Sequence, residues 1–210
     1  MGMRMGMGAD WRNPAYAYAF PYPACLTRRR LSGIVLSMSL IVQVGDGVLR
    51  QVAAEVPIAD ITSPKIQGIL KDMEATLSVE PDGAALAAPQ IAVPLRIFVL
   101  SRRVFAEDSE HEAASKDPHF IFINPVITKR SKHKKTLEEG CLSVRGRYGT
   151  IIRHSNVTVR AYDEHGKLFS RGAAGLLAQA FQHECDHLDG TLFIDKAKET
   201  WEVEASEARD

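Results

Sequence analysis

The sequence predicts an α+β fold with one folded domain. Two segments, 62–78 and 175–188, have the pattern or composition of helices, and several shorter segments have the apolar runs or alternation of strands. These segments do not alternate regularly as strand and helix, which argues against a parallel α/β fold. With 210 residues and 45% hydrophobic content, the chain can build a sizeable core.

Residues 1–37 differ from the rest in composition. Methionine and glycine alternate at the start, and prolines mixed with aromatic residues follow at 13–23 without a usable period. We therefore predict a poorly ordered N-terminal extension at 1–37 and the folded domain at 38–210. Met38 is a candidate for the biological start of translation.

Three consecutive arginines at 28–30 precede a mostly apolar stretch at 31–44, which loosely resembles a secretory signal. We favour a first strand at 40–44, closed by a turn at 45–47, because no convincing small-residue cleavage site follows. An arginine-rich organelle transit peptide is the third interpretation. No apolar stretch reaches the length of about 18 residues that a transmembrane span needs.

Charge and cysteine content narrow the class of protein. Lys plus Arg and Asp plus Glu both total 26, and a net charge of zero argues against a dedicated nucleic-acid binder. Cys25, Cys141 and Cys185 are too few and too unevenly spaced for a disulfide framework. They fit a reducing compartment, so we expect a cytoplasmic protein, or an organellar one if the extension is a transit peptide.

The predicted elements follow in order along the chain. Apolar residues recur at intervals of three and four from Ile66 to Leu77, which predicts an amphipathic helix at 62–78, with Thr62 or Ser63 as its cap. Buried strands are expected at 97–100 and 120–123, with a charged surface loop at 107–118 between them.

The second half is expected to hold a hairpin and a helix. Residues 156–162 alternate as a strand should, and a turn at 164–167 returns the chain into a second strand. Residues 175–188 are helical in composition, and Gly190 ends that helix.

The predicted helix at 175–188 carries the motif H-E-x-x-H. His183 and His187 are four residues apart, so both imidazoles project from one face and can hold one metal ion. Glu184 can reach over the open position of that ion and act as a general base. Two surface histidines can share a helix by chance, but the apolar residues before His183 indicate a buried helix, where unpaired histidines would be costly.

The third ligand does not come from downstream. The longer metzincin pattern would need a histidine where this chain has Phe193, and the later glutamates lie in a charged tail that looks solvated. Upstream, Cys141 lies in the run E-G-C-L-S at 139–143, and its thiolate suits Fe, Zn, Co or Ni. A lone cysteine is more often a core residue, but a two-histidine site that lacks a ligand reverses that preference. Cys185 lies on roughly the opposite side of the helix, so we interpret it as packing.

Three motifs, at 83–90, 139–143 and 182–190, resemble in order and rough spacing those of the peptide deformylase family. The segment 41–50 is similar to the usual start of that family, and the resemblance covers roughly residues 39–196. It implies antiparallel sheets packed around a central helix that carries the H-E-x-x-H motif. It also implies removal of the formyl group from the formyl-methionine of nascent polypeptides, with release of formate.

The resemblance implies a role for each motif residue. One divalent ion, usually Fe²⁺ with Zn²⁺, Ni²⁺ or Co²⁺ as alternatives, would be bound by Cys141, His183 and His187. Glu184 would be the general base, and the side-chain amide of Gln90 and the backbone N–H of Leu142 would stabilise the developing oxyanion. The substrate peptide would lie along a strand edge, and we expect substrate contacts at Gly83, Ala85, Glu139 and Gly140.

The sequence departs from the family pattern at two places. Ala85 stands where the family usually has a second glycine, so we expect a narrower substrate channel. Arg145 and Tyr148 stand where many relatives have proline and arginine, which puts a salt bridge that supports the site in doubt. Arg145 or Arg147 are the candidates to replace that arginine.

Two rival functions remain at this stage. A deformylase-like metalloamidase with a different N-acyl substrate is suggested by the same departures, at Ala85 and at 145–148. A catalytically silent metal-binding domain is disfavoured, because it would need neither Glu184 nor Gln90. The basic run at 129–135 could make a transient ribosome contact, although such a run is more often a solvated hairpin tip.

Overall fold

The computed structural model describes residues 29–31, 34–36, 39–101, 104 and 120–203. A five-stranded sheet contains, in spatial order, β3 (Ala85–Ala87), β4 (Ile97–Leu100), β5 (Ile121–Arg130), β8 (Asn156–Tyr162) and β9 (Leu168–Ala174). A three-stranded sheet has the order β10 (Glu199–Glu202), β7 (Val144–His154) and β6 (Lys134–Cys141). A small sheet pairs β1 (Arg29–Leu31) with β2 (Ile34–Leu36), and all neighbouring strands are antiparallel.

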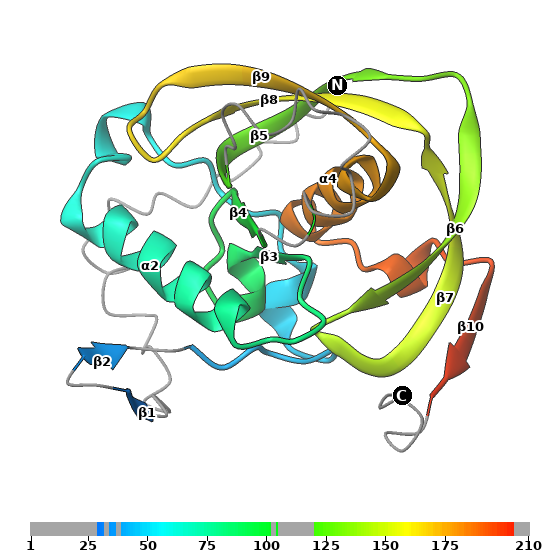
Figure 1. Ribbon diagram of the computed structural model, residues 1–210, viewed down its shortest axis with the longest axis horizontal. Helices are drawn as coiled ribbons and strands as arrows, with labels where there is room; N and C mark the ends of the chain where they lie inside the picture. Colours follow the sequence, from blue (N-terminus) through cyan, green and yellow to red (C-terminus); the bar gives the residue numbers. More distant parts are fainter. Residues whose placement is uncertain (1–28, 32–33, 37–38, 102–103, 105–119, 204–210) are drawn as a thin grey trace, which may run out of the picture.

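Two long helices complete the domain, α2 (Pro64–Ser78) and α4 (Gly175–Leu188). Figure 1 shows α4 near the centre of the molecule, with β8 and β9 passing on one side and β6 and β7 curving round another. The predicted architecture, antiparallel sheets around a central helix that carries the H-E-x-x-H motif, is therefore confirmed.

The core around α4 is built from aromatic rings. Phe98 and Phe122 on neighbouring strands stack with their ring centroids 4.6 Å apart, and Phe181 of α4 meets Phe122 edge-on at 4.9 Å. All three side chains are fully buried. Because these large rings fix the distance between helix and sheet, they also fix the height of the motif residues above the sheet.

The helix α2 begins as the sequence predicts. The Oγ of Ser63 accepts a hydrogen bond from the backbone N–H of Ile66 at 3.4 Å, and Pro64 occupies the first turn. The apolar residues at the predicted three- and four-residue intervals are buried against the sheet. The strands at 97–100 and 156–162 and the final helix are also confirmed.

Some elements differ from prediction. The strand expected at 40–44 is wrong: the N–H of Val42 donates to Gln90 O, whereas that of Val44 donates to Ser143 O, so no single strand pairs with this segment. The charged tail contains strand β10, whose side chains are exposed but whose backbone pairs with β7. The loop predicted at 107–118 and most of the extension predicted at 1–37 lie outside the described residues.

Candidate metal centre

The helix α4 presents two imidazoles on one face. His183 and His187 lie one turn apart, and their ring centroids are 4.9 Å from each other. His187 is 1% exposed, so the site lies inside the domain. Gly190, with a positive φ of 72°, ends the helix directly after the motif, and a side chain there would collide with the backbone oxygen of Arg50 at 2.7 Å.

Cys141 meets this face from the end of β6. Its Sγ lies 3.2 Å from the Nε2 of His187, and the candidate ligand atoms of Cys141, His183 and His187 all lie within 4.8 Å of one another. The predicted ligand set is thus brought together in space. One sulfur and two nitrogens form a donor set that suits Fe, Zn, Co or Ni.

The electrostatics of the cluster fit a bound cation. Burial lowers the pKa of His187 well below its usual value, which keeps the ring neutral, as a metal ligand must be. Burial would also lower the pKa of His183, but the hydrogen bonds of Cys141 and Glu139 raise it well above the usual value. The surroundings of His183 therefore favour positive charge at this position, and a divalent ion would bind there by displacing the proton of the ring.

Glu139 orients His183 from behind. The Nδ1 of His183 lies 3.0 Å from the Oε2 of Glu139, which leaves the Nε2 as the nitrogen available to a metal. Burial would raise the pKa of Glu139, but hydrogen bonds with Arg153 and His183 outweigh it and lower the pKa to about 2. Glu139 is therefore a carboxylate that positions a ligand, although it also lines the cleft where we expected it to contact substrate.

Arg153 holds this carboxylate in place. It donates from Nε to Oε1 of Glu139 at 2.7 Å and from Nη2 to Oε2 at 2.8 Å. Its Nη1 donates to Asp186 at 2.6 Å, and Lys196 donates to the other oxygen of Asp186 at 2.6 Å. A continuous chain of charged groups thus links the surface at Lys196 to Glu139 at the site.

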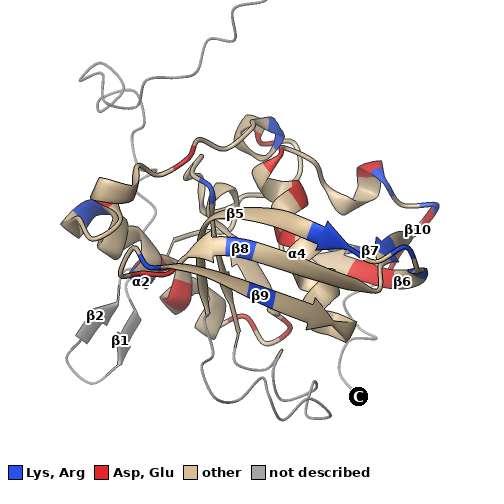
Figure 2. Ribbon diagram, turned by 90° about the horizontal axis from the view of Figure 1, so that it is seen from above, with Lys and Arg blue, Asp and Glu red and all other residues tan. Residues whose placement is uncertain are grey.

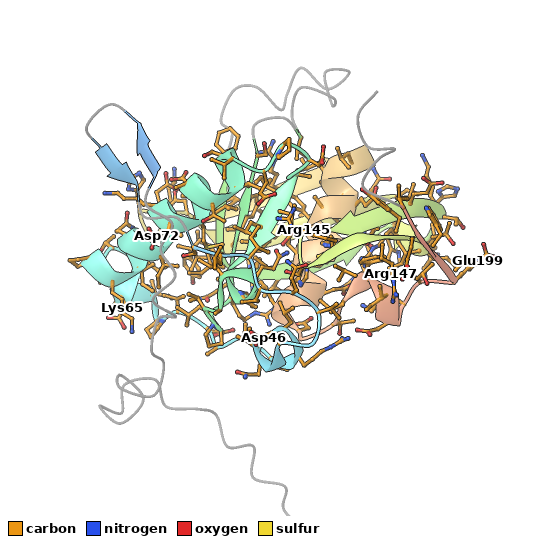
Figure 3. All side chains as sticks on the ribbon, turned by 90° about the horizontal axis from the view of Figure 1, so that it is seen from below. Asp46, Lys65, Asp72, Arg145, Arg147 and Glu199 are labelled. Atoms are coloured by element: carbon orange, nitrogen blue, oxygen red, sulfur yellow. The ribbon has the colours of Figure 1, made fainter. Side chains whose placement is uncertain are left out.

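Neither candidate for the missing arginine, Arg145 or Arg147, makes this salt bridge, which Arg153 supplies instead. Arg145 pairs with Glu80 at 2.9 Å and Arg147 pairs with Glu202 at 2.7 Å. Figure 3 shows both arginines, with Arg147 on the side of the molecule nearer to β10 and Glu199. Arg153 was missed because it lies 14 residues beyond Glu139, and only the pairing of β6 with β7 brings the two together.

Gln90 points its amide nitrogen into the cluster. The Oε1 accepts a hydrogen bond from the backbone N–H of Ala87 at 2.8 Å, which fixes the orientation of the amide group. The Nε2 then lies 3.2 Å from Ser143 Oγ and 3.6 Å from Cys141 Sγ. The side chain is only 2% exposed, so this donor is held ready without solvent competition.

Glu184 is buried beside the ligands. Burial raises the pKa of its carboxyl to about 7, the range expected of a general base that works near neutral pH. Its Oε2 has no hydrogen-bond partner among the described residues, although the side chain is 3% exposed and lines the cleft. A buried carboxylate oxygen of this kind is available to a water molecule in the cleft.

A cleft of about 490 Å³ opens onto the cluster. It is lined by residues of β3, β6 and α4, and both β3 and β6 are edge strands of their sheets. The expected contact residues Ala85 and Gly140 line it, as do Leu142, His183 and Glu184. An extended chain can therefore lie between two strands with unpaired edges.

Gly83 lies elsewhere. It does not belong to the residues that line the cleft, and a side chain at this position would lie 2.7 Å from Leu77 Cδ1 of α2. Its lack of a side chain serves the packing of α2 against the segment that leads into β3.

Cys185 is buried in the core around α4, and burial raises the pKa of its thiol to about 12, as the packing interpretation expects.

The segment at 40–44 ties two motifs together. Val42 donates to Gln90 O at 2.9 Å, and Val44 donates to Ser143 O at 2.7 Å. The Nε2 of Gln43 donates to Leu142 O at 3.0 Å. These bonds fix the distance between the amide of Gln90 and the backbone after Cys141.

Comparison with known proteins places these motifs in a family. The family model described as polypeptide deformylase matches residues 38–202. Peptide deformylase 1A, chloroplastic/mitochondrial, of Arabidopsis thaliana is 43% identical over 162 residues, which cover 74% of this chain and 60% of that relative. Peptide deformylase of Desulforudis audaxviator is 42% identical over 157 residues, which cover 75% of this chain and 92% of that relative. The match spans 60% of the length of each of two plant relatives.

Solved structures agree with the sequence comparison. A peptide deformylase from Legionella pneumophila has a TM-score of 0.65 and 36% identity, over 77% of this chain and 87% of that one. A Met-Ala-Ser-bound peptide deformylase from Acinetobacter baumannii has a TM-score of 0.66 and 27% identity, over 77% of this chain and 99% of that one. Neither α2 nor α4 is long and apolar enough to cross a membrane.

Proposed function

Because the chain belongs to the polypeptide deformylase family, we propose that it removes the formyl group from the formyl-methionine of nascent polypeptides and releases formate. The observation that carries this proposal is the cluster of Cys141, His183 and His187, with Glu184 beside it, at the end of a cleft between two strand edges. The catalytic domain is proposed to extend over residues 38–210.

Enzymes of this family depend on a metal ion, and Cys141 Sγ with one nitrogen each of His183 and His187 would hold it here. Fe²⁺ is the proposed ion, with Zn²⁺, Ni²⁺ or Co²⁺ as alternatives that the same donor set accepts. When bound, such an ion acts as a Lewis acid and lowers the pKa of water toward neutrality.

The residues of the chain account for the movement of protons and charge. Glu184 takes a proton from the attacking water as the new carbon–oxygen bond forms. The amide of Gln90 and the backbone N–H of Leu142 donate to the formyl oxygen while it gains negative charge. Glu184 then returns the proton to the departing amine as the carbon–nitrogen bond breaks, which leaves formate and a free N-terminus.

The two strand edges explain how a polypeptide is held for this reaction. Backbone groups of β3 and β6 that face the cleft can pair with an extended substrate, and such pairing does not depend on the substrate's sequence. The methionine side chain would be directed toward α4, where Leu176 and Ala180 line the cleft. This arrangement suits an enzyme that must process many different nascent chains.

An activity assay tests the proposal. Protein prepared anaerobically with Fe²⁺ should release formate from formyl-Met-Ala-Ser, and the Glu184→Gln variant, loaded in the same way, should do so about 10²–10⁴-fold more slowly. The matched substrate control is acetyl-Met-Ala-Ser. If the acetyl peptide is hydrolysed as fast as the formyl peptide or faster, the proposal is replaced by the alternative, a metalloamidase with a different N-acyl substrate. Ala85, which stands in the cleft lining where the family usually has glycine, is the residue that suggests this alternative.

A transient contact with the ribosome is proposed for the basic run at 129–135. All five lysines and arginines of this run are exposed: Lys129, Arg130, Lys132, Lys134 and Lys135. Figure 2 shows Lys and Arg in blue at the end of β5. Cosedimentation with ribosomes that weakens with added salt, and that is lost when these five residues are replaced by serine, is the expected result. Cosedimentation of the serine variant as strong as that of the wild type would refute the proposed contact.

The proposed location is the cytoplasm, where nascent chains and a reducing environment occur together. An organelle is the alternative, which the names of the plant relatives favour. A fluorescent protein fused after residues 1–37 distinguishes the two, because a transit peptide would direct it to the organelle.

A further inference from the structure

Tyr148 occupies an unusual place beside the cleft. It lies on β7 at the register position of Gly140 on β6 and of Trp201 on β10. Its ring covers Gly140 so closely that a β-carbon there would lie 2.7 Å from Cε1 and 3.0 Å from Cδ1. The ring nevertheless remains 40% exposed and lines the cleft. An aromatic face is thus presented to whatever pairs with β6.

The two faces of β6 differ sharply. Glu139 points inward to His183 and Arg153, whereas Glu138 and Gly140 lie on the outer face with Tyr148. Side chains of a paired strand alternate between the same two faces. If the methionine side chain points inward toward α4, the side chain of the second residue must point outward, onto the face of Gly140.

The distance between the substrate strand and β7 determines which side chains, at the residue after the formyl-methionine, can reach the ring of Tyr148. Neighbouring strands lie about 4.8 Å apart, so a substrate strand on the free edge of β6 lies about 10 Å from the backbone of β7. Gly140 has no side chain to fill the space between them, and the ring of Tyr148 leans over it. A long apolar or aromatic side chain at the second position spans this gap, whereas alanine or serine does not.

We infer that the ring of Tyr148, packed on Gly140, is a specificity-determining shelf that selects nascent chains with a large apolar or aromatic residue directly after the formyl-methionine. The inference rests on the proposed function for its substrate, but its evidence is the packing of Tyr148 on Gly140. The contact is made equally in the ground state and in the transition state, so it should lower KM and leave kcat nearly unchanged.

Kinetics on two peptides test the shelf. The wild-type protein should process formyl-Met-Phe-Ser with a kcat/KM about threefold to tenfold above that for formyl-Met-Ala-Ser, the range that one aromatic contact supplies. Tyr148→Thr should bring this ratio close to one, mainly through KM, and Tyr148→Phe should keep it. The matched control is Ile152→Thr, which removes another exposed apolar residue from the same face of β7 away from the cleft and should keep the ratio.

Binding of the unformylated peptides separates the shelf from the reaction. Calorimetry with Met-Phe-Ser and Met-Ala-Ser should give the same ratio of Kd values and the same loss in Tyr148→Thr. If the protein hydrolyses neither formyl peptide but keeps this ratio of Kd values, the role of Tyr148 is supported and the proposed function is refuted. Protein that hydrolyses both peptides without preference, or Tyr148→Thr protein that keeps the preference, would overturn the shelf alone.

Discussion

Arg153 donates a hydrogen bond to each carboxylate oxygen of Glu139, at 2.7 and 2.8 Å, and the two side chains are only 5% and 3% exposed. Such a bidentate pair in the interior is strong only while both partners are present. It also stands directly behind a metal-ligand candidate, since Glu139 contacts His183. The stability of the fold and the geometry of the site therefore depend on the same contact.

Removal of Arg153 should destabilise the protein strongly. Arg153→Leu leaves Glu139 buried without its main partner, and we expect a loss of about 3–5 kcal/mol in the free energy of unfolding, measured by urea denaturation. Arg147→Leu is the control, because its pair with Glu202 is exposed and should cost at most about 1 kcal/mol. Equal losses in the two variants would contradict this assignment.

The contribution of Glu139 to stability should depend on pH. The pKa of Glu139 is lowered from 4.5 to about 2, so its stabilising effect is complete above pH 4.5 and disappears as the pH falls toward 2. We expect metal-free wild type to exceed metal-free Glu139→Gln in unfolding free energy at pH 7, with a gap that narrows below pH 4.5. A gap that stays constant from pH 7 to pH 3 would refute the shift.

Cys141 and Cys185 should differ in their effect on metal content. Cys141→Ala should lose tightly bound metal, measured by elemental analysis after gel filtration, because the sulfur donor is removed from the cluster. Cys185→Ala should keep one ion per chain, since that thiol lies in the core around α4. Full metal content in Cys141→Ala would transfer the ligand role to another residue.

Glu184→Gln should separate metal binding from turnover. The amide keeps the size of the side chain but cannot accept and return a proton, so we expect kcat to fall by about 10²–10⁴-fold with unchanged metal content. The measurements are steady-state kinetics and elemental analysis of the same sample. A variant that retains wild-type turnover would remove Glu184 as the base.

Gln90→Met should lower kcat more than it changes KM. The variant keeps an unbranched side chain of similar length but has no N–H to donate, and loss of one oxyanion donor costs about 10²–10³-fold in kcat. Thermal unfolding serves as the control, because the hydrogen bond between Ala87 N–H and Gln90 is also lost. A normal kcat in a folded variant would show that the amide does not act on the reacting oxygen.

The two helices could be predicted from the sequence because the features that identify them are local. The apolar periodicity of α2 reflects burial of one face, and the cap at Ser63 marks its start. Likewise, the four-residue spacing of His183 and His187 determines that they share a face of α4 wherever the helix lies.

The hairpin of β6 and β7 could not be read in the same way. Its inward positions include the charged residues Glu139 and Arg153 as well as the apolar Ile151, whereas Tyr148 and Ile152 are exposed. Because both faces mix polar and apolar residues, the alternation rule does not identify the buried face. Arg153, the partner of Glu139, was missed for a second reason, because the register between two strands is a tertiary property.

The central place of α4 has a consequence for folding during synthesis. Phe98 and Phe122 are synthesised long before Phe181, whose ring packs against both of them in the folded domain. Until α4 has emerged, that face of the sheet lacks its cover, and the contacts that close it join residues more than 50 positions apart. The domain therefore reaches its native packing only after α4 has been synthesised, and chains truncated before α4 would expose an aggregation-prone surface.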